Sequence, residues 1–188
     1  DEVEHAYTTI GGRELRHRIE HSQVVSLEDI PRFKDLDVIP SMQPTHATSD
    51  MNMAEDRLGI ERLKGAYAWR SFLDQGSILV SGSDFPIELA NPFHGIHAAV
   101  TRQNRLNEPR GGWIPEQSIT TEEAFRSFTL DAAWAAHQEM ILGGLTEGKW
   151  ADFILVDQDV FSIPANDLWK TTVVETWLAG KLVYEKTK

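Results

Sequence analysis

The sequence predicts an α/β fold in which short buried strands alternate with helices. Three strand-like runs lie at residues 15–21, 38–43 and 78–80, and polar residues follow each of them. Between them, segments 26–36 and 66–75 carry apolar residues at helical spacing. Helices between short buried strands imply parallel pairing and a βαβ architecture.

The first strand, residues 15–21, ends in Glu20 and His21. We expect the next helix to begin at Ser26, because a serine with an acid three residues later is a helix-start pattern. The apolar members of this helix are Leu27, Ile30, Phe33 and Leu36. The end of the strand therefore presents an acid and an imidazole next to each other.

The second strand, residues 38–43, ends at Gln43 and is followed by His46. Residues 47–61 are polar and predict a long loop with room for a helical turn. Loops of that length in compact domains are often functional. In the helix that follows, the aromatic residues at helical spacing are expected to lie in the core; they are Tyr67, Trp69 and Phe72.

The third strand is the apolar run 78–80, and small residues lead from it to Asp84. Pro86 prevents further strand pairing. A carboxylate at the carboxyl end of a buried parallel strand occupies the place where α/β barrels hold their catalytic groups. The alternative is that Asp84 only caps the segment that follows it, as Asp before a turn often does.

Two more helices are predicted after Asp84. One begins near Phe93, and the Gly/Pro-rich stretch 104–117 that follows it predicts a surface loop. Thr120 opens a capping box in front of a long helix that is expected to reach about Met140. His94 and His97 on the first of these helices could share one face, but surface or packing roles are the simpler expectation.

The pattern changes near residue 143, where a turn-rich segment begins. Strands are predicted at 151–157, 173–178 and 181–184, and Ala179-Gly180 between the last two is a hairpin signal. A small antiparallel β region therefore follows the βα region.

Composition narrows the class of protein. The chain has 188 residues, enough for one domain or for part of a larger one. Its net charge of −11 argues against a nucleic-acid partner, and no apolar run is long enough to span a membrane. Because cysteine is absent, histidines and carboxylates must hold any metal, a donor set that suits Zn, Fe, Ni or Mn.

Four motifs follow one another along the chain. They are Arg18-Ile19-Glu20-His21, Gln43-Pro44 with His46, Gly82-Ser83-Asp84-Phe85-Pro86, and the segment 144–153. In this order they resemble the amidohydrolase superfamily of metal-dependent hydrolases, whose pattern G-x-L-x-x-G-x-x-A-D is similar to residues 144–153. The similarity extends from about Arg16 to Tyr184, and the branch it resembles contains N-substituted formamide deformylase-like proteins.

The resemblance implies a partial TIM (β/α)8 barrel followed by strands of a small β-sandwich. Residues 1–142 would hold about strands six to eight of the barrel, and residues 143–188 the carboxyl-terminal part of the sandwich. A complete barrel takes ~250 residues, and the family's His-x-His motif is absent. We therefore expect the carboxyl-terminal portion of a larger enzyme, with the missing amino-terminal part as its partner.

The same resemblance assigns roles to single residues. His21 and Asp84 are expected to bind the metal, and Asp84 is expected to act as the general base. Gln43 and His46 are expected to contact the substrate. Glu20 either accepts a hydrogen bond from the His21 ring or points to the opposite face of the strand. Without a metal, His21 would be an ordinary strand-end histidine bonded to backbone.

The implied function is hydrolysis of a C–N bond other than a peptide bond, in an amide or formamide-type small molecule, by metal-activated water. Zinc is the expected metal. The isolated chain is expected to be inactive, and one alternative is a non-catalytic structural or interaction domain that needs its missing part. Another alternative is an α/β binding protein that is not an enzyme. We expect a cytoplasmic protein without nucleic-acid or membrane partners, and leave a homo-oligomer open.

Overall fold

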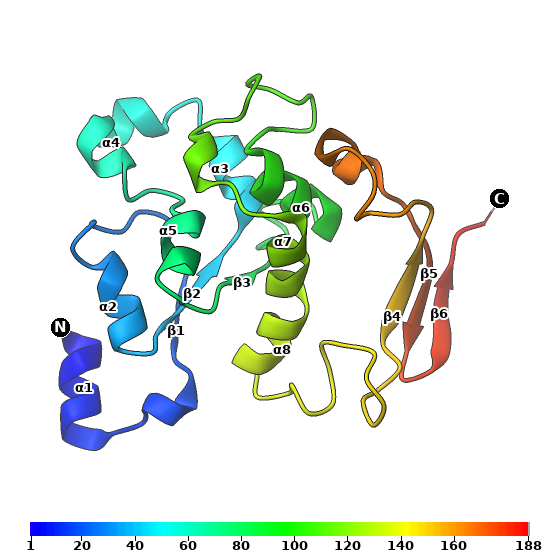
Figure 1. Cartoon of the computed structure of the whole chain (residues 1–188), viewed down its shortest axis with the longest axis horizontal. Coiled ribbons are helices and arrows are strands. Elements are labelled where there is room, and N and C mark those ends of the chain that lie inside the picture. The colour runs from blue at the N-terminus through cyan, green and yellow to red at the C-terminus, as the bar shows by residue number, and fades with distance from the viewer. Residues whose placement is uncertain (188) are drawn as a thin grey trace.

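The parallel sheet predicted from the sequence is present in the fold. A computed structural model describes residues 1–187. Its first sheet contains β1 (Arg18–Glu20), β2 (Ile39–Met42) and β3 (Val80–Ser81), paired parallel in the order β1-β2-β3 (Figure 1). Within the described residues, β1 and β3 each pair with one strand only, so both outer edges of the sheet are free.

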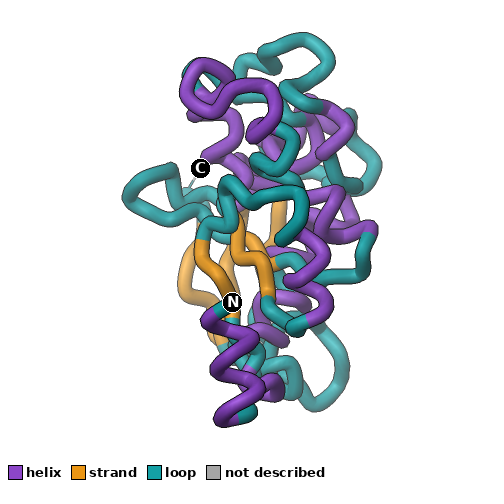
Figure 2. The backbone as a smooth tube through the Cα atoms, turned by 90° about the vertical axis from the view of Figure 1, so that its left-hand side faces the viewer, coloured by secondary structure: helices purple, strands orange, loops and turns teal. Residues whose placement is uncertain are grey.

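Helices connect these strands and form a layer beside them, as Figure 2 shows. One short helix lies between β1 and β2, and three lie between β2 and β3. The helices are α1 (Glu2–Ile10), α2 (Ile30–Asp35), α3 (Pro44–Asp50), α4 (Ala54–Leu63), α5 (Trp69–Asp74), α6 (Pro92–Thr101), α7 (Thr121–Phe128) and α8 (Leu130–Ala135), with short 3₁₀ turns η1 (Arg13–Leu15), η2 (Pro115–Gln117) and η3 (Ala165–Lys170). Within residues 1–187, no helix has both the length and the apolar character needed to cross a membrane.

The main core lies between the sheet and this helix layer. Trp69 and Phe72 of α5 are fully buried in it, as expected, and the Phe72 ring meets the edge of Phe33 with ring centroids 4.9 Å apart. Phe93 of α6 and Leu168 of η3 are buried in the same cluster. The core therefore includes a residue from the carboxyl-terminal segment, which fastens that segment to α6.

The first difference between prediction and structure lies between β2 and α5. The loop expected at residues 47–61 is wrong, because α3 and α4 occupy most of it. Pro44 stands in the first turn of α3, where its fixed φ favours a helix start. Ala54 is the only buried residue of α4, which is kinked at Gly59, so the sequence shows no apolar stripe there.

The helix starts are partly as predicted. At Thr120 the capping box is confirmed, since its hydroxyl accepts from the Glu123 amide and the Glu123 carboxylate accepts from the Thr120 amide. The single helix to Met140 is wrong: α7 ends and α8 begins around Thr129, whose φ of −127° and ψ of −87° interrupt the helix. Ser26 does not cap α2, because its hydroxyl bonds Asp29 within the preceding turn.

The second sheet confirms the predicted antiparallel region. It contains β4 (Phe153–Val156), β5 (Val173–Leu178) and β6 (Lys181–Glu185), in the order β4-β5-β6. Ala179 and Gly180 at the hairpin turn both have positive φ, 48° and 73°, as a type I′ turn requires. Figure 1 shows this sheet at the end of the molecule opposite α1 and α2. The sandwich and the domain division at residue 143 remain predictions.

Candidate metal centre

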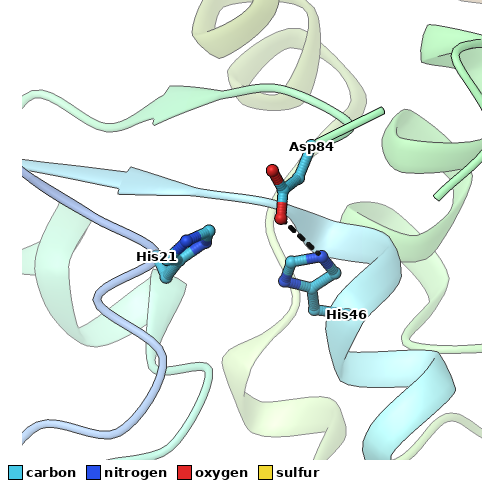
Figure 3. Close-up of side chains that lie close together, drawn as sticks. All are labelled: His21, His46 and Asp84. Atoms are coloured by element: carbon cyan, nitrogen blue, oxygen red, sulfur yellow. Dashed lines mark ion pairs between the residues drawn. The ribbon is translucent and has the colours of Figure 1, made fainter. Parts of the chain in front are cut away.

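Three side chains meet at the carboxyl ends of the parallel strands. His21 follows β1 directly, His46 lies on α3 just beyond β2, and Asp84 lies shortly after β3. Because parallel strands end at the same edge of a sheet, these residues converge there although they are far apart in the sequence. One nitrogen or carboxylate oxygen from each lies within 4.8 Å of the others, and Figure 3 shows the side chains directed toward one another.

The backbone at two of these positions is unusual. His21 has φ 70° and Asp84 has φ 56°, both in the left-handed region that side chains other than glycine rarely adopt. The Ser22 hydroxyl donates to the Ile19 carbonyl at 2.9 Å and helps to hold the turn after β1. Such conformations persist only where the surroundings fix them, and they concentrate at functional sites.

His46 carries a buried nitrogen that lacks a hydrogen-bond partner. Its Nε2 atom lies 3.6 Å from Oδ2 of Asp84, too far for a hydrogen bond (dashed line in Figure 3). The His46 side chain is 12% exposed and that of Asp84 is 36% exposed. A buried polar atom without a partner costs free energy, so a group that accepts the lone pair of this nitrogen would stabilise the site. A divalent cation between the imidazole and the carboxylate satisfies both.

Gln43 determines which nitrogen of His21 faces the cluster. Its Oε1 atom lies 2.7 Å from Nδ1 of His21, and Gln43 is buried. An amide oxygen only accepts hydrogen bonds, so Nδ1 is the donor, and in the neutral ring Nε2 then keeps its lone pair. Histidines that bind metals are oriented in this way by a hydrogen bond from their other nitrogen. The predicted substrate contact of Gln43 is not tested by this geometry.

Glu20 does not accept the hydrogen bond of His21. Its carboxylate accepts from the Ser41 hydroxyl at 2.5 Å and pairs with Arg18. Burial acts to raise the pKa of Glu20, but the hydrogen bonds from Ser41 and Arg18 together outweigh it and leave the pKa below its usual value. Glu20 is therefore an ionised partner of its neighbours along the sheet, and Gln43 takes the place expected for it beside His21.

The pair of histidines on α6 lies outside the cluster. His97 is buried, and its Nε2 atom lies 3.0 Å from Oδ1 of Asn107. Burial lowers the pKa of both His94 and His97, which favours their neutral forms. Among the described residues, His21, His46 and Asp84 form the group with metal-binding spacing. His94 and His97 therefore lie outside the group with metal-binding spacing.

The sequence predicted His21 and Asp84 as metal ligands and His46 as a substrate contact, and the structure brings all three side chains together. The signal for His46 is its position just beyond the end of a parallel strand, which it shares with the other two residues. The hydrogen bond between Gln43 and His21 had no separate signal, because it joins side chains that follow two different strands.

The fold is that of part of an amidohydrolase-superfamily protein. A sequence profile of the amidohydrolase family matches residues 1–184, and the chain belongs to this family. It is 34% identical over 175 residues to Protein LONG AFTER FAR-RED 3 of Arabidopsis thaliana, covering 93% of this chain and 30% of that protein. It is 32% identical to the putative amidohydrolase YtcJ of Bacillus subtilis, covering 92% of this chain and 33% of that protein.

Two further similarities concern the branch of the amidohydrolase family and the fold of the chain. The N-substituted formamide deformylase of Arthrobacter pascens is 27% identical, a more distant similarity, over 90% of this chain and 31% of the enzyme. The structure of an uncharacterized metal-dependent hydrolase from Pyrococcus horikoshii superimposes with a TM-score of 0.72 at 27% identity, over 87% of this chain and 32% of that one. The chain thus spans about a third of the length of these relatives, and its fold is consistent with part of a barrel.

Proposed function

We propose that this chain is the carboxyl-terminal part of a metal-dependent hydrolase that cleaves a C–N bond other than a peptide bond. The convergence of His21, His46 and Asp84 around an unpartnered imidazole nitrogen carries the proposal. Membership of the amidohydrolase family supports it. Residues 1–142 would supply one side of the barrel and residues 143–188 part of a β-sandwich, with the remaining barrel strands contributed by the rest of the protein.

Zinc is the metal that we propose. Two imidazole nitrogens and one carboxylate are a donor set that zinc accepts in catalytic sites, where a further position stays open. The structure of an atrazine chlorohydrolase mutant from Arthrobacter aurescens, complexed with zinc and atraton, shares the fold with a TM-score of 0.64 at 22% identity. In this chain His21 and His46 would hold the ion through Nε2 and Asp84 through its carboxylate. When bound, the ion would lower the pKa of a water molecule toward ~7.

Asp84 would move the proton in this reaction. Its side chain is 36% exposed, so a water molecule can reach it, whereas His46 is largely buried. Asp84 would accept a proton as the water oxygen bonds to the carbonyl carbon, and it would donate that proton to the nitrogen as the C–N bond breaks. The products are a carboxylic acid, which gains the hydroxyl group of the water molecule, and an amine, which gains its remaining proton.

His21 and His46 would orient the site without exchanging protons. The Gln43 amide oxygen accepts a hydrogen bond from Nδ1 of His21, which leaves Nε2 to bind the ion. The finer substrate class that we propose is an N-substituted formamide or a related small amide, because one relative carries that activity in its name.

The experiment uses the full-length protein. After loading with zinc, release of amine from N-substituted formamides and small amides is measured. We expect turnover that a chelator abolishes and added zinc restores. If the full-length protein binds no divalent metal and hydrolyses none of these compounds, the proposal is wrong and a non-catalytic domain is favoured.

A further inference from the structure

Tyr67 is held in place on several sides. It lies just before α5 with φ 51°, and its side chain is buried. Its backbone amide donates to the Gln23 carbonyl at 2.8 Å, and its carbonyl accepts from Nη1 of Arg102 at 3.0 Å. Its ring meets Trp113 edge-on with centroids 5.3 Å apart. The position of its hydroxyl is therefore fixed by the core.

That hydroxyl joins two other side chains. It donates to Oδ2 of Asp50 at 2.6 Å and accepts from Nε2 of Gln23 at 2.8 Å, and Gln23 also donates to Asp50. Burial raises the pKa of Tyr67, and the hydrogen bond to Asp50 raises it further, so the hydroxyl keeps its proton. Three polar groups thus satisfy one another around a single buried oxygen.

The two residues that Tyr67 joins belong to the segments that carry the imidazoles of the candidate metal centre. Gln23 lies two residues after His21, in the loop that follows β1. Asp50 lies four residues after His46 on α3, so the two side chains share one face of that helix. A shift of Asp50 or Gln23 would therefore change the position of one histidine relative to the other.

We infer that Tyr67, Asp50 and Gln23 form a positioning network that sets the distance between His21 and His46 and so the affinity of the site for its metal. The inference rests on the proposed function. None of the three residues belongs to the cluster itself, so they act through the backbone. Binding sites must hold their ligands to within about 0.5 Å, and such supporting contacts supply that precision.

The variant Tyr67→Phe tests the network, because it removes the hydroxyl and keeps the ring that packs on Trp113. The dissociation constant for zinc is measured by chelator competition in the full-length protein, and the visible absorption spectrum is measured after cobalt substitution. We expect zinc to bind about 10- to 100-fold more weakly, as for other contacts that orient metal ligands, and the cobalt spectrum to change.

The matched control is Thr171→Val. It also removes a buried hydroxyl, which accepts from Nε2 of Gln158 at 2.7 Å, but it lies between η3 and β5 and bonds no residue of the network. We expect wild-type zinc affinity and an unchanged cobalt spectrum. The unfolding midpoint of each metal-free variant shows whether it is folded.

Asp50→Asn is the second variant and keeps the volume of the side chain. The double variant carries both Asp50→Asn and Tyr67→Phe. If the three residues act as one unit, its zinc affinity is no lower than that of the single variant that binds zinc more weakly. Wild-type affinity and spectrum in both single variants, or losses that simply multiply in the double variant, would overturn the network. If the wild-type protein binds no metal, the proposed function itself fails, which is a different result.

Discussion

Nε2 of His46 lies 3.6 Å from Oδ2 of Asp84. This nitrogen is buried and has no hydrogen-bond partner among the described residues. His46 lies on α3, which follows β2, and Asp84 lies in the loop that follows β3 of the same parallel sheet. A nitrogen lone pair and a carboxylate at this distance repel unless a cation or a proton lies between them. A metal ion bound between the two atoms, as we propose, would remove this repulsion.

Replacing Asp84 by Asn tests its role as general base. Asn has nearly the same shape and tolerates the left-handed backbone at this position, so the fold should be retained. Loss of a positioned proton acceptor lowers rates by about 10²–10⁴-fold. We expect at least that reduction in kcat of the full-length enzyme, with an unfolding midpoint close to wild type. A fully active Asn variant would refute the assignment.

Replacing His46 by Asn tests whether His46 binds the metal as well as the substrate. We expect zinc affinity to fall at least tenfold, because the variant removes a nitrogen donor from the site. His94→Asn on α6 is the control, since His94 lies outside the cluster. Zinc affinity is measured by chelator competition. Equal affinities in wild type and the His46 variant would leave His46 only its predicted substrate contact.

Gln43 can be tested with a pair of variants. Gln43→Leu leaves Nδ1 of His21 without an acceptor, so the ring is no longer held with Nε2 toward the cluster. Such losses cost about 10- to 100-fold in metal affinity. Gln43→Glu keeps an acceptor and should bind zinc nearly as tightly as wild type. If both variants bind alike, the orientation of His21 does not depend on this hydrogen bond.

The stability of the fold should depend on pH through Glu139. Its carboxylate forms two hydrogen bonds with Arg16, at 2.7 and 3.0 Å, which join the segment before β1 to the segment after α8. The hydrogen bond from Arg16 is the main cause that lowers the pKa of Glu139 to about 2 from its usual 4.5. Because the folded value is the lower one, this contribution to stability is complete above pH 4.5 and is lost as the pH falls toward 2.

We therefore expect Glu139→Gln to lower the unfolding temperature at pH 6–7, and the difference from wild type to shrink between pH 4.5 and 2. Glu147→Gln is the control, because Glu147 makes no ion pair in the described part of the chain. Thermal unfolding followed by circular dichroism across this range is the measurement. A difference that stays constant with pH would show that the ion pair does not stabilise the fold.

His21 and Asp84 could be located from the sequence because each follows a short apolar run, and parallel strands end at a common edge. Gln43 beside His21 could not, because that contact depends on the register between β1 and β2, where Glu20 pairs with Ser41. Tyr67 was expected to be an ordinary core aromatic, and its burial confirms that much. Its hydroxyl contacts depend on a left-handed backbone that no sequence period reveals.

The helices α3 and α4 were missed for a related reason. Together they bury few side chains, so the apolar periodicity that predicts a helix is absent there. At Thr129 a single helix was predicted where the structure has two, because apolar periodicity continues across the backbone break between α7 and α8. Periodicity reports which face is buried and does not report where the backbone turns.

The most direct test of the central claim is a crystal structure of the zinc-loaded full-length protein, with anomalous diffraction recorded at the zinc absorption edge. The account predicts a single strong anomalous peak in contact with His21, His46 and Asp84. A peak elsewhere with none at these three residues, or no peak in zinc-loaded crystals, would contradict it.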